Sequence, residues 1–168
     1  MIFVTVGTHE QQFNRLVEYM DNLKADGTIA EDVIIQTGYS DYEPKHCRWQ
    51  KLYPYQEMLD HVAGARIVIT HGGPSSFIMP LQVGKIPVVV PRQKQFEEHV
   101  NDHQLDFCRE VASRQKNIIL VEDVSELGAV ICGYDGMAAQ MDASQNSNNQ
   151  KFCAEFAKLA ETLVCGKK

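Results

Sequence analysis

Three stretches of this chain combine residue types that bind or transform small molecules. The most distinctive is His71-Gly72-Gly73-Pro74-Ser75-Ser76, which lies between an apolar run and a helical pattern. Two glycines let a ligand approach the backbone, and proline suits a first helical turn because it lacks an N–H. Serine hydroxyls can donate hydrogen bonds, and the free N–H groups of a helix start attract anions. The stretch predicts a phosphate or diphosphate site, with a tight serine-capped turn as the structural alternative.

The second stretch runs from Arg92 to Gln104 and follows another apolar run. It brings together carboxylates, amides and imidazoles, which are the groups that bind the hydroxyls of a sugar. A solvated helix start with capping acids is the alternative. The candidate substrate contacts in this stretch are Arg92, Glu98, His99, Asn101, Asp102, His103 and Gln104.

The two histidines of this stretch raise the question of a metal. His99 and His103 are four residues apart, so a helix would place them on one face, where zinc could bind. The chain has no HExxH pattern, and diphosphate chemistry without a metal fits these residues as well. We therefore expect no metal site.

The third stretch is Gly7-Thr8-His9-Glu10, at the end of the first apolar run. His9 or Glu10 could act as a general base, and His9 could instead donate to a phosphate. A polar loop histidine without a catalytic duty is the alternative. A further turn at Gly38 also ends an apolar run. Ligands bind beyond the carboxyl ends of the strands in an open α/β sheet, so we expect Gly7, Thr8 and Gly38 to line the same cleft.

The composition is that of an ordinary globular domain with a sizeable core. Of 168 residues, 44% are apolar and 23% are charged, and the net charge is −6. This acidic balance disfavours nucleic-acid binding, which needs a basic surface. No stretch has the roughly 18–20 apolar residues of a membrane span, and no secretory signal is visible. The five cysteines are widely spaced and form no CxxC, so we expect free thiols in a cytoplasmic protein.

The elements that must position these residues follow from the apolar patterns. A strand, a glycine turn, a helix and a second strand follow one another between residues 66 and 91, and such βαβ units build parallel sheets. The patterns predict strands over 2–6, 33–38, 66–70, 86–91 and 117–121, a weaker strand near 49–53, and helices over 13–23, 56–62, 77–83, 98–113 and from 124 onward. The predicted fold class is α/β, with a single Rossmann-like, doubly wound, mostly parallel sheet.

We expect one domain over residues 1–139, a polar linker over 140–150 and a final helix over 151–168. The linker is rich in asparagine, glutamine and serine, and the helix carries Phe152, Phe156 and Leu159 at helical spacing. This apolar face either packs on its own domain or contacts a partner.

Taken in order, these segments resemble the C-terminal, donor-binding half of GT-B glycosyltransferases in glycosyltransferase family 28. The matching pieces are VTVGT (4–8), IQTG (35–38), ARIVITHGGPSS (65–76), GKIPVVVP (84–91) and EHVNDHQ (98–104). The chain is more closely similar to the short stand-alone subunits of two-component transferases. These include the catalytic subunit of the eukaryotic dolichol-linked N-acetylglucosaminyltransferase and related bacterial exopolysaccharide and capsule subunits, and the segment 92–104 favours the bacterial branch.

The resemblance implies an inverting hexosyltransferase that moves a hexose from a UDP-sugar to a lipid-linked saccharide acceptor in polysaccharide biosynthesis. The turn at 72–76 would hold the diphosphate, and Asp102, His103 and Gln104 would contact hydroxyls of the donor sugar. The UDP-sugar is a substrate, and no cofactor is implied. Because a chain of this length has room for only one of the two GT-B domains, the resemblance also implies a membrane-associated, acceptor-binding partner subunit. Such a partner would hold this chain at the inner face of the membrane.

One position departs from the family pattern. Related donor domains carry a ribose-binding glutamate five residues before the glycine matched by Gly84, and this chain has Met79 there. Glu97 or Glu98 is the substitute that we consider. The departure supports a second hypothesis, a non-catalytic nucleotide-sugar-binding or regulatory subunit. A different α/β enzyme, such as an oxidoreductase, is disfavoured because no GxGxxG follows the first strand.

Overall fold

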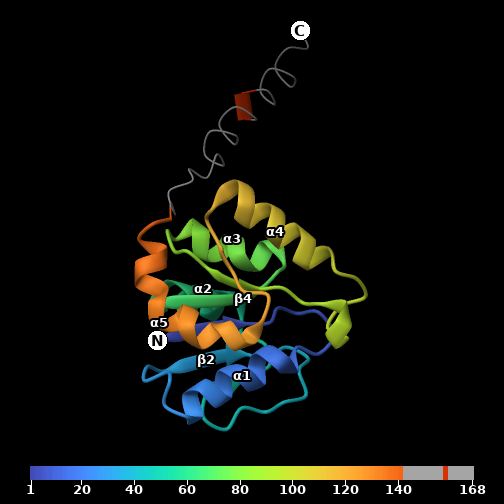
Figure 1. Ribbon diagram of the computed structural model, residues 1–168, viewed down its shortest axis with the longest axis vertical. Coiled ribbons are helices and arrows are strands. Elements are labelled where there is room, and N and C mark those ends of the chain that lie inside the picture. Colours follow the sequence, from blue (N-terminus) through green and yellow to red (C-terminus); the bar gives the residue numbers. More distant parts are fainter. Residues whose placement is uncertain (142–156, 159–168) are drawn as a thin grey trace.

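Short runs of β-branched residues form a parallel sheet, which is the frame of the structure (Figure 1). The computed structural model of the chain describes residues 1–141 and 157–158. Within them, six strands lie in the order β3-β2-β1-β4-β5-β6. Their bounds are β1 (Ile2–Thr5), β2 (Val33–Gln36), β3 (Arg48–Gln50), β4 (Ile67–His71), β5 (Val88–Val90) and β6 (Ile119–Leu120).

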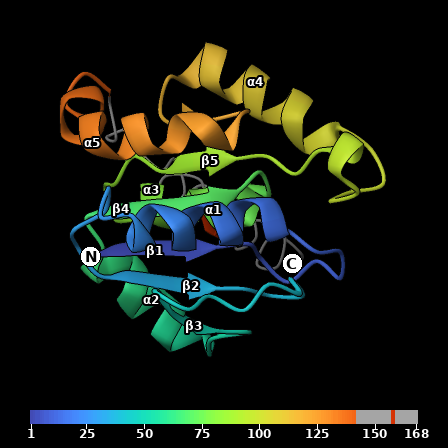
Figure 2. The same ribbon diagram turned by 60° about the horizontal axis from the view of Figure 1, so that its bottom comes forward.

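Helices cover both faces of this sheet, as Figure 2 shows. The helices are α1 (Asn14–Ala25), α2 (Tyr55–Gly64), α3 (Pro74–Gln82), α4 (His103–Gln115) and α5 (Leu127–Ala138), with short 3-10 turns η1 (Lys94–Phe96) and η2 (Val124–Glu126). Helices α1 and α5 pack on one face, and α2, α3 and α4 pack on the other. The predicted α/β fold with one doubly wound parallel sheet is therefore confirmed.

The two central strands are buried on both faces because each of their side chains meets a helix layer. Ile67 and Ile69 of β4 join the cluster under α1 and α5, whereas Val68 between them joins the cluster under α2. Such strands contain apolar residues without interruption, which is why the sequence pattern identified them. Their burial makes the central sheet a rigid support.

All six strands run in parallel, so their carboxyl ends meet at one edge of the sheet. There Thr5 at the end of β1 lies in register with Gln36 of β2 and Thr70 of β4. The segments that follow β1, β4 and β5 carry the three stretches singled out in the sequence. The topology alone thus brings them together.

Helix α4 begins at His103, five residues later than predicted. The preceding residues take other conformations: Glu97 has a left-handed backbone with φ 58°, and the carboxylate of Glu98 is fully buried. The predicted apolar helix position Val100 is 68% exposed. The prediction that His99 and His103 share a helix face is therefore wrong, because His99 precedes the helix.

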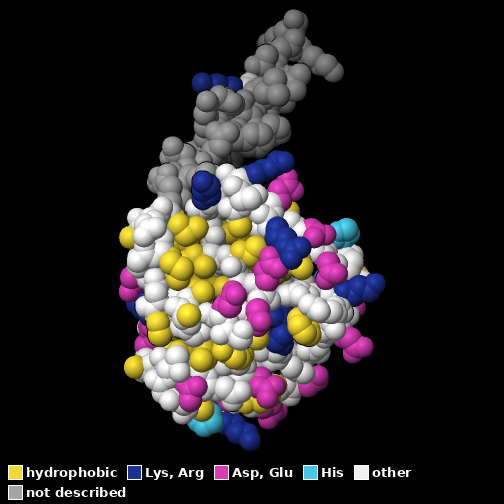
Figure 3. Space-filling view, in the orientation of Figure 1, with side chains coloured by type: hydrophobic (Ala, Val, Ile, Leu, Met, Phe, Trp, Pro, Cys, Tyr) yellow, Lys and Arg dark blue, Asp and Glu magenta, His cyan; other side chains and the backbone are white. Residues whose placement is uncertain are grey.

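The first described range ends at Met141, beside an apolar groove between α4 and α5. The groove has a volume of about 640 Å³, and its lining includes Ala112, Ile119, Met137 and Met141. Figure 3 shows apolar side chains gathered on this face, near α5. The predicted linker over 140–150 and the predicted helix over 151–168 lie outside the described residues, apart from 140–141 and 157–158.

Two predictions about the whole chain can be compared with the described part. None of the helices within it is long and apolar enough to cross a bilayer. Cys47, Cys108 and Cys132 are free thiols, and the first two are buried.

The buried carboxylate of Asp21 on α1 organises the segment between β2 and β3. It accepts backbone N–H groups of Lys45 (2.9 Å), His46 (2.8 Å) and Cys47 (3.0 Å), and the Tyr42 hydroxyl donates to it at 3.0 Å. Burial alone would raise the pKa of Asp21, but these donors outweigh it and lower the pKa to about 2. The ionised form of Asp21 therefore stabilises the fold.

We predict that Asp21→Asn lowers the free energy of unfolding at pH 7 by about 2 kcal/mol. A carboxyl whose pKa is lowered by folding stabilises above its unfolded pKa, and this contribution disappears as pH falls through the folded pKa of about 2. The difference between wild type and variant should therefore narrow from pH 5 to pH 3 in urea unfolding. The control is Asp32→Asn, which removes an exposed carboxylate paired with Arg48 at 3.3 Å. It should change stability by less than about 0.5 kcal/mol. Equal losses in the two variants would contradict the prediction.

Candidate functional site

The imidazole of His71 lies between two glycines at the carboxyl edge of the sheet. A Cβ atom at Gly73 would lie 2.2 Å from its Cε1 atom, and one at Gly7 would lie 2.3 Å from its Nε2 atom. Gly7 also has a left-handed backbone, with φ 76°. Only glycine fits these two positions while the ring stays where it is. The β1–α1 and β4–α3 segments therefore meet at a single buried side chain.

The hydrogen bonds of His71 define which of its nitrogens carries the proton. Nδ1 accepts the N–H of Gly73 at 3.0 Å, and Nε2 lies 2.8 Å from Oγ of Ser76. Burial, aided by the charge of Arg92, lowers the pKa of His71 to about 4, so the ring is neutral near pH 7. The proton is then on Nε2 and is donated to Ser76. The Ser76 hydroxyl keeps its own proton for an acceptor in the cleft.

The first turn of α3 opens into the same place. Gly73 precedes the helix, Pro74 occupies its first position, and no side chain within residues 1–141 caps it by a hydrogen bond. Pro74 and Ser75 are exposed and Ser76 is half-buried. The N–H of Gly73 is bonded to His71 and that of Ser76 to the Gly73 carbonyl oxygen at 3.0 Å, so the Ser75 N–H, the Ser76 hydroxyl and the helix dipole are the groups that can attract an anion here.

Two hollows flank this anion site. One, of about 340 Å³, lies over the ends of β1, β2 and β4, and is lined by Thr5, Gly7, Thr8, His9, Gln36, Met58, His71, Ser75, Ser76 and Gln104. The other, of about 480 Å³, lies between the start of α3 and α4, and is lined by Gly72, Pro74, His99, His103, Gln104, Asp106, Phe107 and Glu110. Gln104 lines both hollows, so the site runs continuously across the start of α3. We call them the sheet-side hollow and the α4-side hollow.

Sequence reasoning missed several residues of these hollows. Thr5, Gln36 and Met58 line the sheet-side hollow, and only the strand register brings Thr5 and Gln36 together. Asp106, Phe107 and Glu110 line the α4-side hollow. Their spacings of three, four and seven residues from His103 place them on one helix face, so this signal was present in the sequence.

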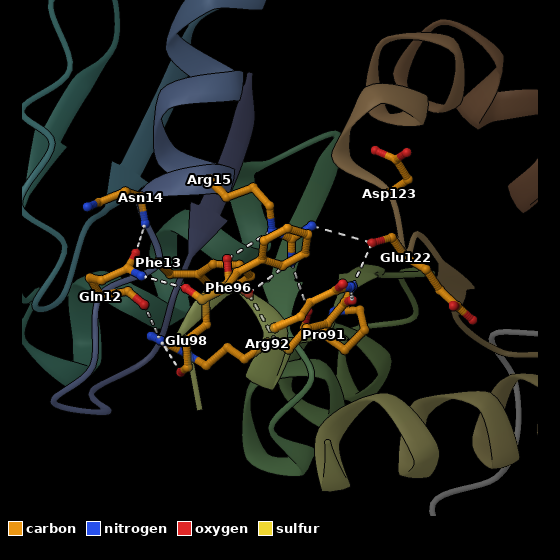
Figure 4. A network of polar contacts seen from close by, with 12 residues as sticks. Gln12, Phe13, Asn14, Arg15, Pro91, Arg92, Phe96, Glu98, Glu122 and Asp123 are labelled. Carbon is orange, nitrogen blue, oxygen red and sulfur yellow. Dashed lines mark hydrogen bonds and ion pairs between the residues drawn. The ribbon is translucent and has the colours of Figure 1, made fainter. Parts of the chain in front are cut away.

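Arg92 and Glu98 are fully buried, and the terminal nitrogens of Arg92 and the carboxylate of Glu98 bind the protein itself (Figure 4). The Arg92 guanidinium donates to the carbonyl oxygens of Val6, Gln11 and Gln12, each at 2.9 Å, and to that of Glu98 at 3.1 Å. The predicted substrate contact of these two side chains does not fit this burial. They hold together the two segments that form the far end of the cleft.

His9 presents a donor to the cleft. Its Nδ1 atom accepts the N–H of Gln11 at 3.1 Å, so the neutral ring carries its proton on Nε2. Burial, the charge of Arg92 and the nearby His99 lower the pKa of His9, and the two rings lie 4.9 Å apart. Glu10, on the same segment, is exposed. His9 can thus donate a hydrogen bond into the sheet-side hollow, and the Glu10 side chain is accessible from solvent.

Three further predicted residues lie beside the hollows without lining them. Gly38 packs behind Gly7, because a Cβ there would lie 2.8 Å from the Gly7 carbonyl oxygen. The Asn101 side chain accepts the N–H of His103 at 3.2 Å, and Asp102 accepts that of Lys94 at 2.8 Å. In the described chain these side chains shape the segment before α4.

Met79 packs inward from α3. It contacts the cluster of buried apolar residues under α2, which includes Phe3, Val62 and Val68. The position therefore contributes to the core and offers no polar group to the cleft.

No three histidine, cysteine, aspartate or glutamate side chains of the described part are arranged to hold a metal ion.

Comparison with known proteins identifies one family. The model of the glycosyltransferase family 28 C-terminal domain matches residues 1–163. No curated protein matches the chain.

Two solved structures share the fold. The glycotransferase of kitacinnamycin is 16% identical, with a TM-score of 0.57 over 91% of this chain and 37% of that one. The glycosyltransferase SnogD from Streptomyces nogalater is 15% identical, with a TM-score of 0.59 over 95% of this chain and 43% of that one. The six-stranded sheet thus matches one half of a GT-B glycosyltransferase, and the chain spans less than half the length of either protein.

The contact between His71 and Gly73 yields a test of the site's architecture. We predict that Gly73→Ala lowers the free energy of unfolding by about 1–3 kcal/mol, because the new methyl group overlaps the imidazole. In a His71→Ala background the space is free, and the same substitution should cost less than about 1 kcal/mol. A double-mutant cycle in urea measures both.

The control for this cycle is Gly136→Ala on α5, where nothing lies within 4 Å of the added Cβ. It should be neutral or stabilising, since alanine favours a helix over glycine. An equal cost of Gly73→Ala in the two backgrounds would show that His71 is not the constraint.

Proposed function

The chain belongs to glycosyltransferase family 28, as a C-terminal, donor-binding domain, and from this premise we propose its reaction. We propose that it is the donor-binding catalytic subunit of an inverting transferase that moves a hexose from a UDP-sugar to a lipid-linked saccharide acceptor. The observation that carries the proposal is the anion site at the start of α3 with a hollow on either side. A sugar nucleotide has this form, since its diphosphate lies between a nucleoside and a hexose.

The chemistry of the two hollows supports one orientation of the donor. The α4-side hollow offers His103, Gln104, Asp106 and Glu110, which are donors and acceptors suited to hexose hydroxyls. The sheet-side hollow offers Met58 as an apolar contact and the exposed Thr8 as a polar one. We therefore assign the hexose to the α4 side, the nucleoside to the sheet side and the diphosphate to Ser75 and Ser76.

In the proposed reaction an acceptor hydroxyl oxygen attacks the anomeric carbon and forms the new glycosidic bond. The bond from that carbon to the phosphate oxygen breaks, and UDP leaves with the electron pair. The developing charge on UDP meets the Ser75 N–H, the positive end of the α3 dipole and the Ser76 hydroxyl, which lies 2.8 Å from Nε2 of His71. Arg92, buried beneath the cleft, adds positive potential.

The proton of the acceptor hydroxyl needs a base on the opposite face of the hexose. His9 carries its proton on Nε2 and lines the sheet-side hollow, so we assign it a donor role toward the diphosphate. Glu10 is exposed on the same segment, and we propose that Glu10 or a group of the partner takes the proton.

An exposed apolar surface supports the proposal of a partner subunit. The chain spans 37% and 43% of the two similar structures. Beside the carboxyl edge of the sheet, three large apolar side chains are exposed: Tyr39 (55%), Leu52 (44%) and Tyr55 (70%). We propose that a membrane-associated, acceptor-binding subunit covers them, as in two-component transferases of exopolysaccharide and capsule synthesis, and holds this chain at the inner face of the membrane.

The packing of Met79 favours a second candidate function. Because this position offers no carboxylate for the ribose, the chain could bind a sugar nucleotide while the partner performs the chemistry. A transfer assay on the reconstituted pair separates the two candidates. If activity survives both Gly73→Ala and Gln104→Ala, the catalytic assignment is wrong.

The donor orientation predicts a split between two variants in calorimetric titrations with UDP, UDP-glucose, UDP-galactose and UDP-N-acetylglucosamine. Ser76→Ala removes a donor to the diphosphate and should weaken every ligand by about 10-fold or more, as expected for a hydrogen bond to a charged group. His103→Ala should weaken the preferred UDP-sugar and leave UDP within about twofold.

The matched control for both is Ser113→Ala, an exposed serine on α4 whose hydroxyl bonds only to the Glu110 carbonyl in the described chain. It should leave all affinities unchanged. Failure of the wild type to bind any of the four ligands, alone and with its partner, would overturn the proposed function.

The partner surface predicts a separation of binding from activity. Tyr55→Glu places a charge in the proposed interface and should lower transfer by the reconstituted pair by at least about tenfold, while UDP affinity stays unchanged. Val83→Glu is the control, since Val83 is 47% exposed just after α3 ends, away from the carboxyl edge. Full transferase activity from the isolated chain would remove the need for a partner.

A further inference from the structure

The Arg15–Glu98 ion pair lies on the far side of the β5–α4 segment from the proposed donor site. Glu98 has no exposed surface, and the Arg15 side chain is 15% exposed. Nε and a terminal nitrogen of Arg15 donate to the two carboxylate oxygens of Glu98 at 2.9 and 3.0 Å. This two-pronged geometry is the strongest form of such a pair.

Arg15 is held in this position from several sides (Figure 4). Its guanidinium lies 4.5 Å from the centre of the Phe96 ring, and it donates to the carbonyl oxygens of Pro91 (3.3 Å) and Glu122 (3.4 Å). It lines a separate outer groove of about 270 Å³ and is not among the described residues that line the sheet-side or α4-side hollow. Arg15 therefore touches nothing that would touch a donor.

Glu98 connects this outer contact to the cleft. Its carboxylate accepts the N–H of Gln93 at 3.0 Å, and its carbonyl oxygen accepts from Arg92 at 3.1 Å. His99, which lines the α4-side hollow, is the next residue. The conformation of the segment 92–102 thus depends on a carboxylate that stays buried.

A buried carboxylate keeps its place only while it is compensated. Removal of Arg15 leaves the Glu98 charge compensated only in part, by the nearby Arg92 guanidinium, and such a loss strongly destabilises the segment that carries the charge. For Glu98, this destabilisation would displace His99 and the start of α4. The segment would lose its shape on the side that faces the α4-side hollow, whereas the start of α3 would keep its contacts with His71.

We propose that Arg15 is a positioning residue for the hexose part of the donor, acting through Glu98 on the segment 92–102. This inference rests on the function proposed above. It assigns to Arg15 an effect on the hexose that is separate from any effect on the diphosphate, although the residue lies outside the donor site.

The test compares Arg15→Met with wild type in calorimetric titrations of UDP and of the UDP-sugar that wild type binds most tightly among UDP-glucose, UDP-galactose and UDP-N-acetylglucosamine. Methionine keeps an apolar stem against Phe96 but removes the charge. We expect UDP-sugar affinity to fall about 10-fold and UDP affinity to stay within about twofold. A merely structural role would weaken both ligands alike or neither.

Two further variants make the result specific. Arg15→Met combined with Glu98→Gln removes the orphaned charge and should recover most of the lost affinity. Arg15→Lys keeps a positive charge but cannot donate to both carboxylate oxygens in the way that arginine does, so it should give an intermediate loss of UDP-sugar affinity. It replaces Arg15→Met in the test if that variant fails to fold. The matched control is Arg48→Met, which removes a 68% exposed arginine on β3 that pairs with Asp32. It should leave both affinities unchanged.

Hydrogen exchange supplies a readout that needs no ligand. The Gln93 amide, which donates to Glu98, should exchange at least about 10-fold faster in Arg15→Met, while amides of β4 stay protected. If wild type binds no sugar nucleotide, the proposed function fails and this inference fails with it. If wild type binds but Arg15→Met leaves the ratio of UDP to UDP-sugar affinity unchanged, only this inference is overturned.

Discussion

The imidazole of His71 fills the space that side chains at Gly7 and Gly73 would need, and the floor of the cleft follows from this packing. It draws the end of β1 against the turn after β4. It also fixes the proton on Nε2 and so directs the Ser76 hydroxyl outward. The start of α3 stays open to solvent because the His71 ring packs on its buried side, whereas Pro74 and Ser75 are exposed. An anion site built in this way needs little rearrangement when its ligand arrives.

The local charge behind the cleft opposes the net charge of the whole chain. The net charge is −6, yet two arginines and one glutamate lie in or near the interior behind the cleft. The Arg92 guanidinium binds four backbone carbonyl oxygens, and its charge helps to lower the pKa of His9 and of His71. A low-dielectric interior makes this local positive charge effective over short distances, which supports the proposed attraction of a diphosphate to an otherwise acidic protein.

The sequence predicted the fold and the centre of the site because both depend on local patterns. Strands buried on both faces consist of continuous apolar runs. The turn at 71–76 could be predicted from its glycine, proline and serine residues. The start of α4 was predicted five residues too early because no local pattern shows that Glu98 is buried and paired with Arg15, a partner 83 residues away. Arg92 and Glu98 were predicted to contact a substrate because their burial is also not visible in the local sequence. Gln36 and Thr5 were missed because strand register decides their meeting.

A cleft floor made of backbone has a consequence for how such proteins diversify. Gly7, Gly72 and Gly73 leave no room for a larger side chain, since a Cβ at any of them would lie within 3 Å of a neighbour. Substitution of these glycines therefore cannot change the ligand specificity of the cleft without displacing the residues that form it. Variation must come from the face of α4 that carries His103, Asp106, Phe107 and Glu110. Mutational libraries aimed at new ligands therefore have a short, surface-exposed target on one helix, while the floor beneath it stays constant.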